Sequence, residues 1–338
     1  MSYKSILIIK PSSLGDVVHT LPAVAAIRDA NPDAEITWVI NPEWAPLLRG
    51  NRDINHVHIF PRGDFRGLGA PGSLLPWMLK TRRLRPEAAV DFQGLLRSAL
   101  IGRICGARDF FGLSDSREGS RLFYKKIARV DRRSHAVERY LKLAECTGAA
   151  VTLPLRFPLP SGDPLPRFDT HPPFILLHPF ARGRGKSMSD RAVEKFARNC
   201  APTRVVVVGK SAIRFEPPQN CIDLSNQTNL LQLIWLIRAA RVVVSVDSGP
   251  MHIAAALTSN LIALHTWTDP RRVGPYNATA WIWRSGELRQ MRDFPVGEKL
   301  PRGRSFRTAD STTVTELVAD LWNAPGDLSA PLPTRDRN

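Results

Sequence analysis

Short, continuous apolar runs recur along the chain, each followed by a polar loop and a stretch of helical periodicity. A run without alternation is typical of a strand buried on both faces of a parallel sheet. In the first half we expect strands at 6–9, 35–40, 56–60, 88–92 and 110–113. In the second half we expect strands at 174–177, 205–208, 242–246 and 261–264. The alternation predicts an α/β protein with two Rossmann-like, doubly wound domains.

The segments between the runs predict the helices and the domain boundaries. Helices are expected at 17–30, 95–104, 136–147, 190–199, 230–240, 251–257 and 313–322. Pro22 predicts a kink or restart in the first of them, because proline lacks the amide donor of a helix interior. Seven prolines between 152 and 173 predict an extended interdomain linker. We expect domains at 1–160 and 174–322, a linker at 161–173 and a disordered tail at 323–338. Two such domains form a cleft where the carboxyl ends of their sheets meet.

The charge balance indicates an anionic partner. The 338 residues include 47 Lys and Arg against 31 Asp and Glu, a formal charge of +16. Such an excess suits a nucleic acid, a membrane surface or a phosphorylated substrate. The four cysteines form no Cys-x-x-Cys pair and no zinc-spaced cluster, which is typical of a reducing compartment. No run approaches the ~20 apolar residues of a membrane span, so we expect a cytoplasmic protein that touches membranes only from outside.

The loop after the first strand, residues 10–16, is the first candidate site. It lacks the Gly-x-Gly-x-x-Gly turn of dinucleotide enzymes, which disfavours an NAD enzyme. It places the hydroxyls of Ser12 and Ser13 and the carboxylate of Asp16 at the tip of the strand. A carboxylate there could accept a proton from an attacking hydroxyl. The alternative is that Asp16 only caps a helix beside Gly15.

The strand at 242–246 leads into the second candidate site. Ser248 or Gly249 can cap the following helix, and Pro250 suits its first position. A helix N-terminus with free amides favours phosphate, and His252 could add a donor to the same anion. Asp247 ends the strand beside them. The alternative is a structural strand-to-helix turn with a core histidine.

A basic glycine loop at 178–187 is the third candidate site. Its Gly-Lys-Ser sequence resembles a P-loop, but Phe180 occupies a required glycine position. The Gly-Lys-Ser at 209–211 fails in the same way, because Arg204 stands at that position. What remains is a flexible loop with Arg182, Arg184 and Lys186, well suited to a diphosphate. The alternative is a solvated basic loop.

The segment 62–86 combines apolar and basic residues. Leucines, a tryptophan and a methionine at 74–79 stand beside Lys80, Arg82, Arg83 and Arg85. An apolar face with a basic flank suits an anionic lipid surface. Alternatively, the helix packs on its own domain. No aromatic RNA-binding motif or helix-turn-helix pattern occurs, so nucleic acid is not the expected partner.

Several of these segments together resemble the lipopolysaccharide heptosyltransferases, glycosyltransferase family 9. In the first half the resemblance rests on residues 10–16 and 19–22, on Asp91-Phe92-Gln93-Gly94-Leu95, on Arg117-Glu118 and on His135-Ala136-Val137-Glu138-Arg139. In the second half it rests on Asp247-Ser248-Gly249-Pro250-Met251-His252 and on Thr268-Asp269-Pro270. Residues 93–95 and 135–139 look most like the type I enzyme, which adds the first heptose to the Kdo region of lipid A.

The resemblance implies a GT-B fold and an inverting transferase that uses ADP-heptose with no metal and no cofactor. Asp16 would be the general base. The donor would contact the following residues: Ser12, Ser13, Lys186, Asp247, Ser248, Gly249 and His252. Arg117 would face an anionic lipid A or Kdo-type acceptor, with Arg62 and Arg66 as further candidates. The enzyme would work peripherally on the cytoplasmic face of the inner membrane.

Two departures from the family pattern concern the donor. The family often carries hydroxyls where this chain has Phe180-Ala181-Arg182, and an acidic residue near the adenosine where it has 209–212. Other hypotheses therefore stay open. They are a same-fold transferase for another nucleotide sugar or a later core acceptor, a nucleotide-sugar epimerase, and a non-enzymatic module that binds anionic lipid or RNA.

Overall fold

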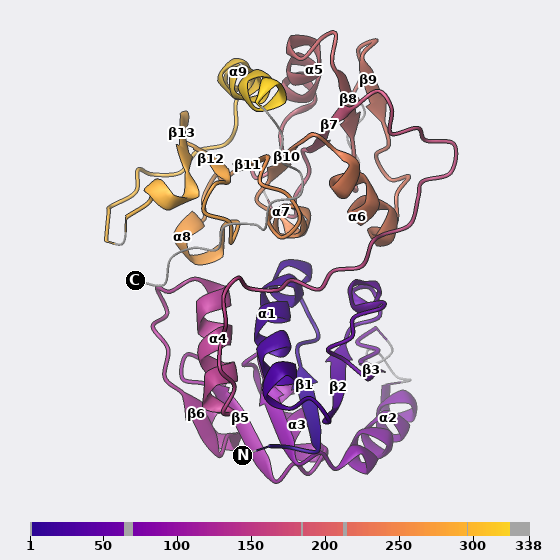
Figure 1. Cartoon of the computed structure of the whole chain (residues 1–338), viewed down its shortest axis with the longest axis vertical. Helices are drawn as coiled ribbons and strands as arrows, with labels where there is room; N and C mark the ends of the chain where they lie inside the picture. Colours follow the sequence, from indigo (N-terminus) through magenta and orange to yellow (C-terminus); the bar gives the residue numbers. More distant parts are fainter. Residues whose placement is uncertain (1, 64–69, 184, 212–214, 296, 325–338) are drawn as a thin grey trace. The chain divides into compact units, whose positions relative to one another are not determined.

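The computed structural model describes residues 2–63, 70–183, 185–211, 215–295 and 297–324 (Figure 1). The chain divides into two compact units, Met1–Pro160 and Ser161–Asn338. Of the predicted tail, residues 325–338 lie outside the described residues, and the preceding helix includes Asn323. None of the helices in the described part is long and apolar enough to cross a membrane.

The N-terminal unit is built on a parallel sheet with strand order β3-β2-β1-β4-β5-β6 in its described residues. Its strands are β1 (Ser5–Ile9), β2 (Glu35–Ile40), β3 (His56–Ile59), β4 (Ala88–Asp91), β5 (Asp109–Leu113) and β6 (Lys126–Ala128). Because β1 pairs with both β2 and β4, the chain direction across the sheet reverses at β1. Open α/β sheets bind ligands at such a reversal, outside the carboxyl ends of the strands.

Helices cover both faces of this sheet. They are α1 (Leu14–Ala30), η1 (Ala45–Leu48), α2 (Ala70–Leu84), α3 (Leu96–Ile104), η2 (Ser120–Phe123) and α4 (Ala136–Cys146). Leu7 and Ile9 of β1 pack in one core cluster with Trp77 of α2 and Ile101 of α3. Since neighbouring side chains of a strand point to opposite faces, Ile6 and Ile8 face the other side of the sheet. Figure 1 shows α1 and α4 on that side.

The C-terminal unit repeats this design. Its described strands lie in the order β13-β12-β11-β10-β7-β8-β9. They are β7 (Phe174–His178), β8 (Arg204–Val207), β9 (Cys221–Asp223), β10 (Val242–Val246), β11 (Leu261–Leu264), β12 (Trp281–Arg284) and β13 (Glu287–Gln290). Of the strand pairs in the described part of this unit, only β12–β13 is antiparallel. The reversal point is β7, between β8 and β10. The predicted doubly wound α/β architecture is thus confirmed in both units.

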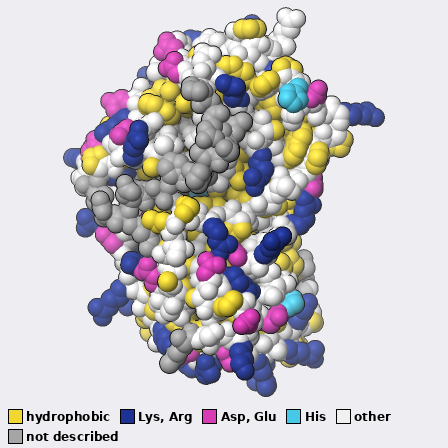
Figure 2. All heavy atoms as spheres, in the orientation of Figure 1, with side chains coloured by type: hydrophobic (Ala, Val, Ile, Leu, Met, Phe, Trp, Pro, Cys, Tyr) yellow, Lys and Arg dark blue, Asp and Glu magenta, His cyan; other side chains and the backbone are white. Residues whose placement is uncertain are grey.

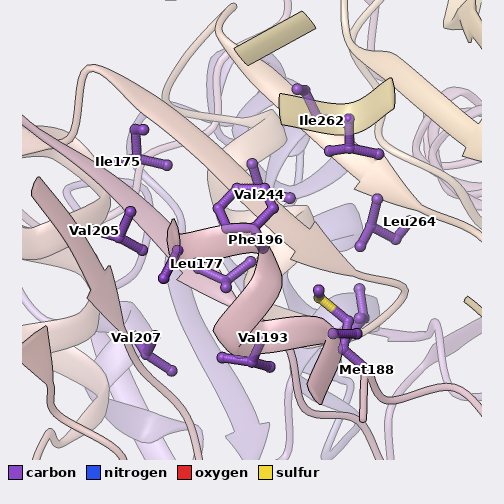
Figure 3. Packing of buried hydrophobic residues seen from close by; sticks show 14 of the residues in the cluster. Ile175, Leu177, Met188, Val193, Phe196, Val205, Val207, Val244, Ile262 and Leu264 are labelled. Carbon is purple, nitrogen blue, oxygen red and sulfur yellow. The ribbon is translucent and has the colours of Figure 1, made fainter. Parts of the chain in front are cut away.

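A continuous apolar core joins this second sheet to two helices. The helices of the unit are α5 (Asp190–Asn199), α6 (Leu230–Ala239), α7 (Gly249–Ala255), α8 (Pro270–Val273), η3 (Met291–Asp293) and α9 (Asp310–Asn323). Phe196 of α5 lies among strand residues such as Leu177 and Val244 (Figure 3). Val314 of α9 belongs to the same cluster. Fully buried valine, leucine and isoleucine runs explain why these strands could be read from the sequence.

Several local expectations were wrong or incomplete. The first helix begins at Leu14 and continues through Pro22 as one helix rather than restarting there. The short strands β6, β9, β12 and β13 were not predicted. The β12–β13 hairpin turns at Ser285 and Gly286, both with positive φ, of 55° and 102°. Such two-residue turns favour Gly, so the Ser-Gly pair was a usable hairpin signal.

Residues 161–173, predicted to link the domains, pack on the C-terminal unit. The amide of Asp163 donates to the Leu231 carbonyl at 3.1 Å. The Arg204 guanidinium donates to the carbonyls of Asp169 and Pro172 at 2.8 and 2.6 Å. Phe168 makes an edge contact with Phe174. The segment is therefore held in place by one backbone hydrogen bond, two hydrogen bonds from the Arg204 side chain and an aromatic contact.

Candidate active site

In the N-terminal unit the loop between β1 and α1 brings Ser12, Ser13 and Asp16 together. Ser13 donates to Asp16 Oδ2 from its amide at 3.1 Å and from its hydroxyl at 2.7 Å. Ser13 is the N-cap of α1, so Asp16 does help to cap this helix. The Asp16 side chain is only partly buried. A capping role and a role as proton acceptor are therefore both compatible with its position.

A buried lysine lies beneath this carboxylate. Lys10 Nζ donates to the Phe92 carbonyl at 3.0 Å and to the Tyr140 hydroxyl at 2.9 Å. The Tyr140 hydroxyl in turn lies 3.4 Å from Asp16 Oδ1. Burial works against the Lys10 charge, but Asp16 and Tyr140 outweigh it and raise the lysine pKa above its ordinary value. Lys10 is therefore a fixed cation at neutral pH that favours the ionised form of Asp16.

The loop after β4 completes this edge of the sheet. Gln93 Oε1 accepts from the Ser12 amide at 3.3 Å. The loop is held by Asp91, whose buried carboxylate accepts from the amides of Gln93 and Gly94 at 2.8 and 3.1 Å. Gly94 has a φ of +66°, and a Cβ there would lie 2.8 Å from Ser116 Oγ. Only glycine therefore fits this turn without displacing a neighbour.

Two of the predicted acceptor arginines lie in loops that follow strands on either side of β1. Arg117 is exposed in the loop after β5, and its amide donates to the Gly94 carbonyl at 2.8 Å. Arg62 is exposed just after β3. Each follows a strand two positions from β1 in the sheet, which is roughly 10 Å away at the usual strand spacing. Arg66, like Arg184 of the basic loop, lies outside the described residues.

In the C-terminal unit Lys186 and Asp247 meet at the reversal point of the sheet. Lys186 follows β7, Asp247 follows β10, and Lys186 Nζ donates to Asp247 Oδ2 at 2.7 Å. Thr268, from the loop after β11, donates to the same oxygen at 2.7 Å. The Lys186 side chain is 25% exposed and the Asp247 side chain 8%. The lysine thus reaches solvent while its partner is almost enclosed.

The electrostatics keep this carboxylate ionised. Burial alone would raise the pKa of Asp247, but nearby His265 and the two hydrogen-bond donors lower it below its ordinary value. Burial also lowers the pKa of His265 to about 4, so that ring is neutral at pH 7. Near neutrality, Lys186 and Thr268 therefore stabilise the charge. His265 Nδ1 lies 3.1 Å from Thr268 Oγ1 and positions that hydroxyl.

The turn into α7 carries the remaining predicted donor residues. Ser248 is its N-cap and Gly249 its first residue. Ser248 Oγ lies 3.3 Å from Nδ1 of His178, a buried ring whose pKa burial lowers to about 4. His252 is buried one turn into the helix and interacts electrostatically with His265. These residues share the edge of the sheet on which Asp247 lies.

An exposed tryptophan borders the basic loop. Trp267 is 48% exposed and directly precedes Thr268. A Cβ placed on Gly185 would lie 3.4 Å from its Nε1 and 2.8 Å from Ser305 Oγ. The loop therefore passes close to the indole, beside the Lys186–Asp247 pair.

Sequence reasoning did not assign roles to Lys10, Tyr140, Thr268, His265 or Trp267. Lys10 directly follows a buried strand, and a lysine there was a usable signal. No such signal marked Tyr140, because it lies in a helix more than a hundred residues from Asp16 along the sequence. Among the described residues, no group of three or more His, Cys, Asp or Glu side chains is placed to hold a metal ion.

Comparison with known proteins places the chain in a family. The sequence model for glycosyltransferase family 9 (heptosyltransferase) matches residues 79–302, about two-thirds of the chain. The lipopolysaccharide core heptosyltransferase OpsX of Haemophilus influenzae is 27% identical over 81% of this chain and 82% of its own. Lipopolysaccharide heptosyltransferase 1 of Salmonella typhimurium is 26% identical over 80% and 91%. Lipopolysaccharide heptosyltransferase 2 of Escherichia coli also matches, at 26% over 82% and 87%.

Solved structures agree on the fold. The E. coli heptosyltransferase WaaC with ADP superposes with a TM-score of 0.74 at 20% identity, covering 94% of this chain and 99% of that one. E. coli ADP-heptose lps heptosyltransferase II gives a TM-score of 0.69 at 22% identity, covering 94% and 98%. The predicted GT-B fold and the resemblance to the type I enzymes are confirmed, and the hypothesis of a non-enzymatic module is wrong. The chain belongs to glycosyltransferase family 9, the heptosyltransferases.

Proposed function

We propose that this glycosyltransferase moves a heptose from ADP-heptose to the Kdo region of lipid A, with inversion and without a metal. Curated relatives named lipopolysaccharide heptosyltransferase 1 support the sugar and the pathway. Structures of a relative with ADP and with ADP-2-deoxy-2-fluoro heptose support the donor. The observation that carries the proposal is the Lys186–Asp247–Thr268 network at the reversal point of the C-terminal sheet.

On the donor side, Lys186 is the phosphate ligand. Its ammonium is partly exposed and donates a hydrogen bond to a carboxylate that remains charged. When the donor binds, the ammonium and the positive end of the α7 dipole at Gly249 stabilise the charge that grows on the departing diphosphate. Asp247, Ser248, Gly249 and His252 line the donor, while Ser12 and Ser13 contact the transferred sugar.

On the acceptor side, Asp16 is the general base. The acceptor hydroxyl oxygen attacks the anomeric carbon as the bond to the diphosphate breaks, and its proton passes to an Asp16 oxygen. A single displacement of this kind inverts the anomeric configuration. Lys10 and Tyr140 hold the carboxylate in place and oppose its protonation before the acceptor arrives. Asp16 can accept the proton only as the hydroxyl becomes more acidic in the transition state.

The exposed arginines suit the acceptor. Arg117 and Arg62 lie in loops that follow strands on either side of β1 and carry the charge needed for an anionic, Kdo-type sugar. An acceptor anchored in lipid places the enzyme peripherally on the cytoplasmic face of the inner membrane. A later core acceptor is the second candidate, because heptosyltransferase 2 relatives match at similar identity.

Calorimetric titration with ADP, UDP and GDP, without divalent metal, tests the donor. Selective ADP binding that is lost on Lys186→Ala supports the proposal, whereas preference for UDP or GDP overturns the heptose donor. Transfer of heptose to Kdo–lipid A and to a heptosylated core, compared side by side, then separates the two acceptors. Transfer only to the heptosylated core would favour the later step.

A further inference from the structure

Three elements on one face of the N-terminal sheet expose an unusual number of leucines. Among the described residues, twelve large hydrophobic side chains are exposed, and six of them belong to α2, α3 and η2. They are Leu74, Leu75, Leu79, Leu96, Leu100 and Leu122. Leu122 is 90% exposed, close to the maximum for any side chain. Apolar exposure concentrated in this way marks an interaction site rather than ordinary surface.

The three elements are adjacent. Helix α3 packs beside α2 on one flank and beside η2 on the other. The larger aromatic side chains of these elements do not share the exposure of the leucines. Trp77 is buried in the core cluster beneath α2, and Phe123 is partly buried against the same cluster. The leucines are thus the apolar part of a surface made by α2, α3 and η2, here called the leucine surface.

Charge within the three segments of the leucine surface has one sign, while the exposed Glu118 lies at its border, where its carboxylate accepts from the Leu96 amide at 3.2 Å. Its three segments contain no Asp or Glu in their sequences. They carry six exposed cations, namely Lys80, Arg82, Arg83, Arg97, Arg103 and Arg121. By contrast, α4 on the opposite face mixes Glu138 and Glu145 with Arg139 and Lys142. Figure 2 shows a mixture of this kind, with Asp and Glu among the Lys and Arg side chains, over the lower part of this unit.

We propose that the leucine surface docks this protein on a bilayer that contains anionic phospholipid. Leucine side chains reach into the boundary between headgroups and acyl chains, while the six cations lie against phosphate and carboxylate headgroups. Two alternatives fit less well. RNA needs exposed aromatic platforms, which the described part of this surface lacks. A second copy of the chain would bring six like charges against six others.

The leucine surface adjoins the edge of the sheet that carries the proposed acceptor residues. This part of the inference rests on the proposed function. Helix α3 begins directly after the Gln93–Gly94 loop that contacts Ser12. The η2 turn begins three residues after Arg117. A bilayer under α3 and η2 would therefore present a lipid-anchored acceptor at the loops after β4 and β5, next to the loop of Asp16.

Flotation of the full-length protein tests the docking. The vesicles are phosphatidylcholine alone or phosphatidylcholine mixed with phosphatidylglycerol. Binding is expected only with the mixture and should weaken as salt rises. Arg97→Gln combined with Arg121→Gln should weaken binding on the order of 30-fold, from the usual effect of two interfacial charges. Leu100→Ser combined with Leu122→Ser should weaken it about tenfold.

Matched controls lie elsewhere on the chain. Leu153, which is 56% exposed, and the exposed Arg198 of α5 provide Leu153→Ser and Arg198→Gln. Both should float like the parent protein. Equal loss in the control variants, or flotation unaffected by the four surface changes, overturns the docking surface. Two further outcomes would overturn it. In one, the surface variants lose binding of an RNA oligonucleotide while their flotation persists. In the other, they lose dimerisation in ultracentrifugation while their flotation persists.

Transfer to a deacylated, water-soluble acceptor separates this inference from the proposed function. The surface variants should transfer heptose to that acceptor at the parental rate, yet transfer more slowly to the lipid acceptor in vesicles. If the parent protein does not float but still transfers heptose to the soluble acceptor, the docking surface alone is overturned. Flotation that depends on the surface, with no heptose transfer to either acceptor, would support the surface and overturn the function.

Discussion

The two units share one scaffold and differ at its reversal point. In each, six strands follow the same parallel order, and loops after the central strands carry the polar residues. In the N-terminal unit a partly exposed carboxylate, Asp16, stands over a buried cation, Lys10. In the C-terminal unit a partly exposed cation, Lys186, stands over a buried carboxylate, Asp247. The inversion teaches that the sheet fixes where a site lies, while loop residues fix its chemistry.

Their surfaces differ as well. Of the twelve exposed large hydrophobic side chains in the described residues, ten lie in the N-terminal unit. The C-terminal unit has only Ile222 and Trp267 among them. This asymmetry matches the partners we propose, a lipid-anchored acceptor for one unit and a nucleotide sugar for the other. Four changes would break or sharpen the comparison.

Asp16→Asn should have the largest effect. The amide oxygen can still accept the hydrogen bonds from Ser13, so the helix cap is kept, but the side chain cannot take a proton. Turnover should fall ~100-fold or more, with ADP affinity unchanged. Steady-state kinetics and calorimetry measure both quantities. Asp33→Asn, an exposed change in the same unit, is the control. Parental turnover in Asp16→Asn would leave Asp16 with the capping role alone.

Acid should destabilise the C-terminal unit through its buried histidines. The pKa of His265 is about 4 when folded, below the ordinary value of 6.5, so its contribution to stability is complete above pH 6.5. This contribution is lost progressively as the pH falls from 6.5 to 4. The loss amounts to about 3 kcal/mol, at ~1.4 kcal/mol for each unit of pKa difference between the folded and unfolded states. His265→Gln should flatten the pH dependence of the free energy of unfolding by that amount. Urea titrations at several pH values measure it, and an unchanged slope would contradict the burial argument.

Lys186→Ala should chiefly weaken donor binding. A charge-assisted hydrogen bond is worth about 1.5–3 kcal/mol, so ADP affinity should fall about tenfold to a hundredfold. Stability should fall too, because Asp247 then lies buried without its cation. Combining Lys186→Ala with Asp247→Asn should restore stability but not ADP affinity. Arg198→Ala, an exposed charge removed from the same unit, should change neither quantity.

Trp267→Ala should have the smallest effect. The indole borders the loop at Gly185, so its loss leaves that loop less well supported around Lys186. We expect ADP affinity to fall about threefold, the size of one weakened packing contact, while Trp267→Phe keeps the parental value. Calorimetry distinguishes the two. A loss with Phe as large as with Ala would point to the indole N–H rather than to packing.

Much of the fold could be predicted because its central strands are buried on both faces. Residues 35–40, 242–246 and 261–264 were predicted with the bounds that the structure gives them. The strands that were missed are short and lie toward the sheet margins, as β6 and β9 do. Their composition is less distinctive, because they have no buried apolar run of their own. They are strands because they pair with a neighbouring strand.

The sequence by itself determined the two doubly wound domains, the resemblance to the family and the loops that hold Asp16, Lys186 and Asp247. Hydrophobic periodicity and local motifs are properties of neighbouring residues, so they can be read along the chain. Only the tertiary structure decided which side chains meet. Tyr140 reaches Asp16 and Thr268 reaches Asp247 because strands far apart in sequence end at one edge of a sheet. Burial then sets the pKa of His265, and burial depends on every element packed around it.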